Sequence, residues 1–314
     1  MAIPALAHPT LPAASGRTER LLSGTWGNLA RAIRSNRKAM AGLSLLVLFT
    51  FVAIAPGLIA PDNPSADIFP VGAGPSLHHL LGTTSYGQDI FSQLIWGARA
   101  SLLVAVIAGL FATVLSVLIG VSAAYLGGFA DDFLSLFTDV FLVIPTFPLI
   151  IVIVAYAKNG GNIVLVSVLV ATGWSYGARQ LRSQTLSLRN RDFLVAARLR
   201  GERKSRIIIH EVLPTMTSLI VANFLGAALY AVLAAAGLQF IGLGNVNSES
   251  WGTMLYWAQN NEALQSGSPL WATMPGVCIA LLGGAFALLN YAFDEIGNPA
   301  LRQVRKSRGR RDRS

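Results

Sequence analysis

The stretch that decides the fold is Ala100–Leu126, which reads ASLLVAVIAGLFATVLSVLIGVSAAYL and contains no charged residue. About 20 consecutive apolar residues form a helix that crosses the hydrocarbon core of a bilayer. Only helices and closed barrels satisfy the backbone inside lipid, and this run is too long and continuous for a barrel strand. Five further runs have the same character, at about residues 40–60, 133–157, 163–178, 216–241 and 270–293. We therefore predict an all-α membrane protein with six transmembrane helices.

The composition excludes other broad classes of protein. Of the 314 residues, 53% are hydrophobic and 12% are charged, and the mean hydropathy is +0.56. Soluble domains carry about 25% charged residues, so neither a soluble two-domain enzyme nor a disordered chain fits. The single cysteine, Cys278, lies in an apolar run, and one cysteine can form neither an intramolecular disulfide nor a zinc framework of paired cysteines. We expect it to be a small buried hydrophobic residue.

The net charge of +9 reflects membrane topology. All of the 24 Lys and Arg residues except Arg99 and Lys158 lie in the N-terminal arm, in the connection between the fourth and fifth runs, or in the C-terminal tail. Cytoplasmic segments of membrane proteins are enriched in Lys and Arg. Both termini and that connection are therefore predicted to be cytoplasmic, which requires an even number of spans. No nucleic-acid partner is expected.

The chain divides into four segments. Residues 1–25 are rich in Ala, Pro and Ser, lack the pattern of a signal peptide, and are predicted to be a disordered cytoplasmic N-terminus. Residues 26–39 are basic and amphipathic, and we expect an elbow helix along the inner membrane surface. Residues 40–301 contain the six spans. Residues 302–314 are predicted to be a basic, solvated cytoplasmic tail, with contact to anionic membrane lipid as the alternative.

Common catalytic and nucleotide-binding signatures are absent from the sequence. It contains no G-x-x-x-x-G-K-[ST], H-E-x-x-H or G-x-S-x-G motif, so we expect no catalytic residue, bound cofactor or metal in this chain. His78 and His79 are adjacent, and neighbours in sequence rarely bind one metal, so we interpret them as loop residues. Asp139 is the one acid inside a predicted span. Such acids are candidates for an intramembrane function, but its place near the cytoplasmic start favours a snorkelling or capping role.

The most informative segment is the connection 190–214, which reads NRDFLVAARLRGERKSRIIIHEVLP. Asp192 is expected to cap a helix start, and Pro214 suits the first turn of the next span. Gly201 suits the position just after the helix end. One helical face, with i, i+3, i+4 and i+8 spacing, contains Phe193, Ala196, Ala197 and Gly201. Its small residues would let another protein approach closely; an ordinary amphipathic surface loop is the alternative.

Ala196-Ala197-x-x-x-Gly201, followed by Leu213-Pro214, resembles the EAA loop of binding-protein-dependent ABC transporter permeases. The whole chain is most similar to the C-type subunit of the dipeptide/oligopeptide/nickel group. In the periplasmic motif His79–Arg99, the matching residues are Gly82, Thr83, Gly87 and Asp89. Further matches are Arg31–Gly42, Gly127–Asp132 with Asp139 and Pro145, Phe240–Gly244, Ser250–Gly252 and Asn298–Arg302.

Four positions or segments depart from the family pattern. Val195 stands where the family usually has an acid, and Thr84 and Gln88 stand where the periplasmic motif usually has Asp and Arg. Leu289–Asp294 reads LNYAFD where the family usually reads like GDxLRD. These differences bear on the transported substrate and on coupling, and they leave the expected fold unchanged.

The resemblance implies a type I ABC importer permease of MetI-like architecture, in which 190–214 contains a cytoplasmic coupling helix. It implies a non-catalytic subunit of the bacterial cytoplasmic (inner) membrane that pairs with a second homologous permease as a heterodimer. Two cytoplasmic ATPase subunits would bind ATP and Mg, and an extracytoplasmic solute-binding protein would deliver the solute. Peptides, either di- or oligopeptides, are the implied substrate, with nickel or another small solute as the alternative.

Two other functional classes compete with this interpretation. A stand-alone secondary carrier or channel usually has buried charges and often two similar halves, and neither is evident in the sequence. An integral membrane enzyme would be expected to have His, Asp or Glu residues clustered near one membrane face. The acid pairs Asp131–Asp132 and Asp294–Glu295 have no His nearby in sequence. Copurified ATPase subunits would distinguish the permease from both alternatives.

Overall fold

The protein is a bundle of long helices. The computed structural model describes residues 36–157 and 161–297. Within these ranges five helices are long and apolar enough to cross a membrane, with Gly161–Leu188 counted as one, and a bent helix pair makes six if it forms one span. The prediction of an all-α membrane protein is confirmed. The predicted segments 1–25 and 302–314, most of 26–39 and the motif Asn298–Arg302 lie outside the described residues.

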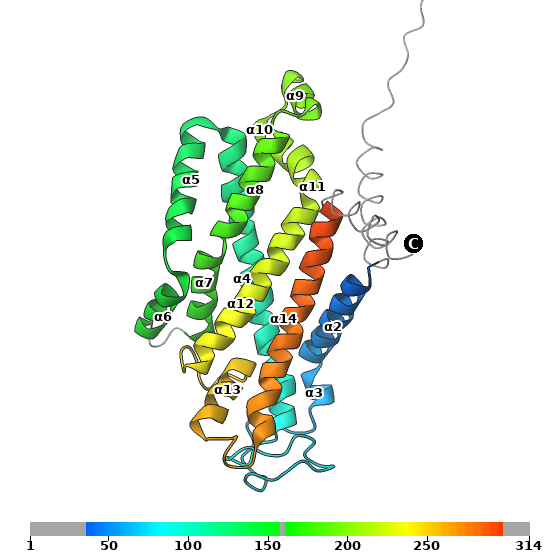
Figure 1. Cartoon of the computed structure of the whole chain (residues 1–314), viewed down its shortest axis with the longest axis vertical. Coiled ribbons are helices and arrows are strands. Elements are labelled where there is room, and N and C mark those ends of the chain that lie inside the picture. The colour runs from blue at the N-terminus through cyan, green and yellow to red at the C-terminus, as the bar shows by residue number, and fades with distance from the viewer. Residues whose placement is uncertain (1–35, 158–160, 298–314) are drawn as a thin grey trace, which may run out of the picture.

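The helices follow one another with short connections except at the loops that precede α4, α13 and α14. Figure 1 shows α9 and α10 at one end of the bundle and α3 and α13 at the other, which we call the α9 end and the α13 end. The elements are α2 (Arg37–Ile54), α3 (Pro56–Ile59), α4 (Ile90–Leu126), α5 (Gly128–Val143), α6 (Thr146–Tyr156), α7 (Gly161–Gly173), α8 (Ser175–Leu188), α9 (Asp192–Leu199), α10 (Lys204–Ile207), the π-helical turn η1 (Ile208–Val212), α11 (Leu213–Thr215), α12 (Thr217–Phe240), α13 (Trp251–Asn260) and α14 (Pro269–Gly297).

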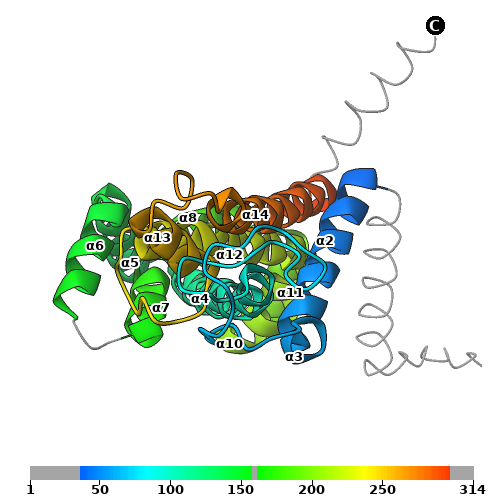
Figure 2. The same ribbon diagram turned by 90° about the horizontal axis from the view of Figure 1, so that it is seen from below.

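The central helix is α4, which Figure 2 shows among α2, α7, α12 and α14. It has 37 residues, so at a rise of about 1.5 Å per residue it is longer than the hydrocarbon core of a bilayer. It begins at Ile90, well before the predicted start near Ala100, because the Asp89 carboxylate caps it by accepting a hydrogen bond from the Ser92 amide. Its first turns therefore extend beyond the spanning region at the α13 end.

The third predicted span is one crossing with a sharp bend. α5 and α6 meet at 81°, whereas the apolar pattern predicts a continuous helix. Ile144, between them, is extended with φ −63° and ψ 127°, because the residue before a proline is disfavoured in the helical region. Pro145 then lacks the amide that would continue the helix. The pair leads from the α9 end to the start of α7 near the α13 end, as expected for one broken span (Figure 1).

Glycines let α4 approach its neighbours at backbone distance. A Cβ added at Gly109 would lie 3.0 Å from Cα of Ala228 on α12, and one at Gly120 would lie 2.3 Å from the carbonyl oxygen of Ala178 on α8. Lipid gives apolar helices no hydrophobic reason to associate, so small residues that permit close van der Waals packing are common in such contacts. These two contacts fix α8 and α12 against the central helix.

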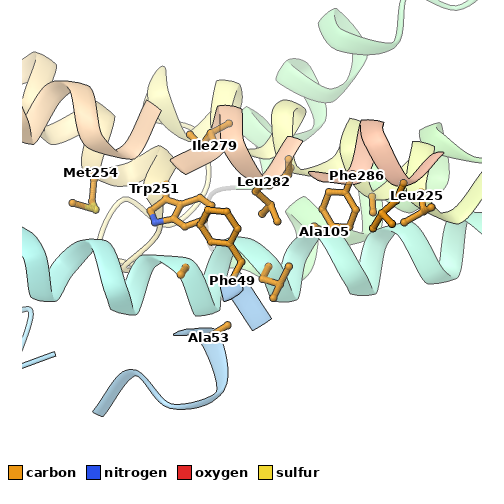
Figure 3. Packing of buried hydrophobic residues seen from close by; sticks show 14 of the residues in the cluster. Phe49, Ala53, Ala105, Leu225, Trp251, Met254, Ile279, Leu282 and Phe286 are labelled. Carbon is orange, nitrogen blue, oxygen red and sulfur yellow. The ribbon is translucent and has the colours of Figure 1, made fainter. Parts of the chain in front are cut away.

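The largest hydrophobic cluster joins α2, α4, α12, α13 and α14 (Figure 3). Trp251 is 1% exposed, and its ring meets Phe49 edge-on with 5.4 Å between centroids. Its indole N–H donates to the carbonyl oxygen of Leu94 at 2.9 Å, which satisfies its one polar group. Gly97 leaves room for this indole, since a Cβ there would lie 2.9 Å from it. α13 is thereby attached to the extended start of α4.

We expect Gly120→Val to disrupt the bundle. The added side chain would be forced against the main chain of Ala178, and a backbone atom cannot rotate away. Overpacking of this kind costs about 1–3 kcal/mol, which should lower the amount of folded protein recovered from membranes several-fold. Size-exclusion chromatography of the solubilised protein and its thermal unfolding midpoint would measure the effect.

Gly284→Val is the matched control, because Gly284 also lies in a long helix and no atom lies within 4 Å of a Cβ built there. It should fold nearly as well as the parent chain. Equal recovery of the two variants would contradict the close packing of α4 against α8.

Candidate functional site

α9 protrudes from the bundle and is held there by a buried apolar cluster (Figure 1). Leu194 and Ala197 are 0% exposed. They belong to one cluster with Val212 and Met216, which precede α12, and with Leu181 of α8. The same cluster includes residues of α4. The helix therefore belongs to one apolar cluster together with the ends of three spans.

The outward face of α9 is apolar and differs from the predicted one. Leu199 is 85% exposed, Val195 40% and Phe193 39%, and Ala196 is also exposed. The prediction that Ala197 shares this face is wrong, because Ala197 packs inward. Phe193–Ala196 and Leu194–Ala197 are both apolar pairs at i, i+3, so spacing alone does not say which pair faces the bundle.

Gly201 ends α9 as predicted. Its φ is +75°, the left-handed conformation that glycine adopts without strain. The Gly201 amide donates to the carbonyl of Arg198 at 3.0 Å, and the Glu202 amide donates to that of Ala197 at 3.3 Å, which together form a Schellman end. No atom lies within 4 Å of a Cβ built at Gly201. The need for glycine here is therefore conformational.

The two ends of the segment differ from prediction by a residue or a short turn. Arg191 is the N-cap and makes no side-chain hydrogen bond to the helix. Asp192 is the first helical residue, where its negative carboxylate interacts favourably with the positive end of the helix dipole. Leu213 and Pro214 lie in α11. Met216, with φ −104° and ψ 9°, separates α11 from α12, so Pro214 precedes the span instead of lying in its first turn.

Two ion pairs connect α5 to α8 near the α9 end. Arg182 donates Nε and Nη2 to the two carboxylate oxygens of Asp131 at 2.7 and 2.9 Å. Arg179 Nη2 donates to Asp139 Oδ1 at 2.7 Å, but these side chains are 61% and 50% exposed. Asp139, expected from sequence to snorkel or cap, thus has an arginine partner that is remote in the chain. The Asp131 pair is the more buried of the two, with exposures of 34% for Arg182 and 15% for Asp131.

The predicted periplasmic motif forms one compact turn at the α13 end. Gly82 and Gly87 have φ of +82° and +76°, and a Cβ at either would lie within 2.5 Å of a main-chain oxygen. Thr83 is fully buried, and its hydroxyl donates to the carbonyl of Pro70 at 2.6 Å. An isolated bridge pairs Thr83 with Asp89. The motif residues therefore shape the loop that leads into α4.

Asp89 also meets His79, which the sequence analysis interpreted as an ordinary loop residue. His79 Nδ1 lies 3.1 Å from Asp89 Oδ1, and Asp89 is fully buried. The possible ligand atoms of Asp62, His79 and Asp89 lie within 4.8 Å of one another, so this is a group in the described chain that could hold a metal ion. The Ser92 amide and His79 already satisfy Asp89 in the structure. His78, as expected, is an exposed loop residue.

The two departures in this motif have structural roles here. The Thr84 hydroxyl accepts hydrogen bonds from the amides of Tyr86 and Gln88, each at 3.2 Å. Gln88 Nε2 donates to Asp67 Oδ1 at 2.6 Å. Both side chains thus stabilise the loop with neutral donors and acceptors.

Comparison with known proteins gives two family matches. The model described as "Binding-protein-dependent transport system inner membrane component" matches residues 116–302. The model described as "N-terminal TM domain of oligopeptide transport permease C" matches residues 24–75. Together they cover most of the chain.

Several named relatives align over most of their length. The dipeptide transport system permease protein DppC of Escherichia coli (strain K12) is 36% identical over 282 residues, 86% of this chain and 91% of that protein. DppC of Alkalihalophilus pseudofirmus is 31% identical over 284 residues, 88% of this chain and 90% of the relative. The oligopeptide transport system permease protein OppC of Mycobacterium tuberculosis (strain ATCC 25618 / H37Rv) is 31% identical over 218 residues, 69% of this chain and 75% of the relative.

We expect Ala197→Asp to loosen α9, because it places a carboxylate in the buried cluster without a partner. Such a change costs about 2 kcal/mol or more, so proteinase K should cleave the segment 190–214 at least tenfold faster in membrane vesicles. Ala196→Asp is the matched control, because the side chain of Ala196 is exposed. This variant should leave the cleavage rate nearly unchanged. Equal rates for the two variants would contradict the inward orientation of Ala197.

Asp131→Asn should destabilise the protein more than Asp139→Asn. The first removes a two-bond, partly buried pair and leaves Arg182 without its partner, at a cost of about 1.5 kcal/mol. The second affects an exposed pair worth about 0–1 kcal/mol. The thermal unfolding midpoint of each purified variant would measure the difference. A larger decrease of the midpoint for Asp139→Asn would contradict this prediction, because the exposed pair would then contribute more to stability than the buried one.

Proposed function

Because the chain belongs to the family of binding-protein-dependent transport system inner membrane components, we propose that it is a permease subunit of an ATP-driven peptide importer. Its named relatives are dipeptide and oligopeptide permeases. The family consists of non-catalytic membrane components that work with other parts of a transporter. The chain is accordingly a multi-pass protein of the inner membrane.

One observation carries the mechanistic part of the proposal: α9 presents exposed apolar side chains on a segment that is packed onto three spans. An exposed apolar patch on a rigid protrusion is suited to docking another protein. The partner we propose is a cytoplasmic ATPase subunit. When the ATPase moves, the buried contacts of Leu194 and Ala197 transmit the movement to the spans, because a packed cluster shifts between discrete arrangements instead of deforming continuously.

The complete importer would contain a second homologous permease in a heterodimer, two ATPase subunits and an extracytoplasmic solute-binding protein. ATP and Mg would bind the ATPase subunits and not this chain. The α9 end would be cytoplasmic, together with both termini, because Lys and Arg are concentrated in the connection 190–214 and in both terminal segments. The α13 end, with the motif Gly82–Asp89, would face the binding protein.

Peptides are the proposed solute, and nickel or another small solute of the same transporter group is the alternative. The distinction can be measured by reconstituting the complete complex with its binding protein in vesicles. ATP-dependent accumulation of labelled di- or oligopeptides would support the proposal. Accumulation of nickel without peptide uptake would replace it with the alternative.

We expect Leu199→Asp to uncouple the transporter. A charge placed in an apolar contact that excludes water should cost about 2 kcal/mol or more, which corresponds to about 30-fold weaker binding of the ATPase subunit. Copurification of the ATPase subunits and ATP-dependent uptake would both be measured. The protein should remain in the membrane at normal levels, because Leu199 is 85% exposed and contributes little to folding.

Leu264→Asp is the matched control for copurification, since Leu264 is 67% exposed and follows α13 at the opposite end of the bundle. It should retain the ATPase subunits. Normal copurification and uptake by Leu199→Asp would disprove the docking role of α9 and return the segment to an ordinary surface loop.

A further inference from the structure

A hollow of about 420 Å³ lies within the spanning part of the bundle. It is bordered by α5 and α6 on one side, by α7 and α8 on another, and by α12 and α14, with Ser116 of α4 at its base. Its volume falls in the range of small-molecule sites.

The lining of the hollow is part polar and part apolar, and it carries no charge. No Asp, Glu, Lys, Arg or His is among the described residues that border it. Three side-chain amides are present, from Gln180 on α8, Asn223 on α12 and Asn290 on α14. Polar groups at membrane depth are costly against lipid and are tolerated where they face water or protein. The hollow is therefore expected to face the interior of an assembly.

Glycines let two of the amides approach neighbouring helices. Asn223 Nδ2 donates to the carbonyl of Leu219 at 3.1 Å, one turn earlier in α12. Its Oδ1 lies 2.8 Å from the position that a Cβ at Gly177 would occupy. Asn290 Nδ2 lies 3.4 Å from the corresponding position at Gly226. Because both positions are glycine, the Asn223 amide can pack closely against α8 and the Asn290 amide against α12.

The remaining hydrogen-bonding capacity of these amides is unused within the described chain. Neither Gln180 nor Asn290 has a side-chain hydrogen-bond partner among the described residues. A carboxamide offers two donors and an acceptor, which complement the C=O and N–H groups of a peptide bond. Nickel(II) favours imidazole, thiolate or carboxylate ligands. The described lining offers none of these ligands.

We propose that this hollow is part of the solute path and that Gln180, Asn223 and Asn290 recognise the main chain of the transported peptide. The inference rests on the proposed function and names the chemistry by which one subunit would accept that substrate class. Recognition of the main chain by neutral amides does not depend on the peptide's side chains. The path would therefore accept peptides of different sequence at similar rates, and selection would lie outside the hollow.

The test uses the complete transporter with its binding protein, reconstituted in vesicles and supplied with ATP. Alanylalanine, alanyl-lysine and alanylglutamate serve as labelled probes, and the variants are Asn223→Leu, Asn290→Leu and Asn290→Asp. Leucine approximates the size of asparagine and removes its hydrogen bonds. We expect each leucine variant to lower uptake of all three peptides by about the same factor, tenfold or more, with normal copurification of the second permease and the ATPases.

Asn290→Asp should make the hollow selective for charge. We expect uptake of alanyl-lysine relative to alanylglutamate to rise at least fivefold, because the carboxylate attracts one side chain and repels the other. Loss of folding cannot produce this change in ratio. Ser167→Leu is the matched control, since Ser167 also donates to the carbonyl one turn earlier but is an exposed residue of α7 that does not border the hollow. It should transport all three peptides normally.

Three outcomes would overturn the inference. The first is normal uptake by Asn223→Leu and Asn290→Leu together in one chain. The second is an unchanged lysine-to-glutamate ratio in Asn290→Asp. The third is loss of the second permease from the leucine variants, which would assign the hollow to a subunit interface. Absence of peptide uptake by the parent complex would instead disprove the proposed function, so the two failures are distinguishable.

Discussion

The close contact of α4 with α8 and α12 is the constraint on which the rest of the structure depends. At Gly109 and Gly120 the helix backbones approach so closely that a methyl group would collide with the neighbouring main chain. Close packing of this kind compensates for the missing hydrophobic drive between helices in lipid. Ser116 lies between these glycines, donates to the carbonyl of Trp174 at 2.6 Å and borders the hollow. Packing and the proposed solute path therefore share one helix.

The same helix connects the two ends of the molecule. Near the α9 end, Val121 and Tyr125 of α4 belong to the cluster that holds Leu194 and Ala197. At the α13 end, Asp89 caps α4 and Trp251 packs against it. A shift of α9 must either move α4 or break the buried cluster. The structure thus supplies a physical route between the proposed docking surface on α9 and the loop that leads into α4, through rigid packed elements.

The distribution of charge indicates why such a protein depends on partners for energy. In the described residues, the ion pairs of the spanning region join α5 to α8 near the α9 end, and the lining of the hollow is neutral. Proton-driven carriers use chains of ionisable groups within the membrane. A neutral path provides no such relay. Under the proposed function, energy for alternating access would be supplied through α9, which agrees with membership of a binding-protein-dependent transporter family.

The sequence by itself determined the features that depend on neighbouring residues. These include the membrane spans, the turn at Gly201 and the loop glycines of the motif Gly82–Asp89, because hydropathy and left-handed backbone conformation are local properties. Only the tertiary structure decided which apolar pair of α9 faces inward and which arginine meets Asp139. The tertiary structure also decided the angle between α5 and α6, and it brought Asn223 and Asn290 to the same hollow. Each of these depends on how helices remote in the chain pack together, and apolar spans look alike in sequence whichever neighbour they meet.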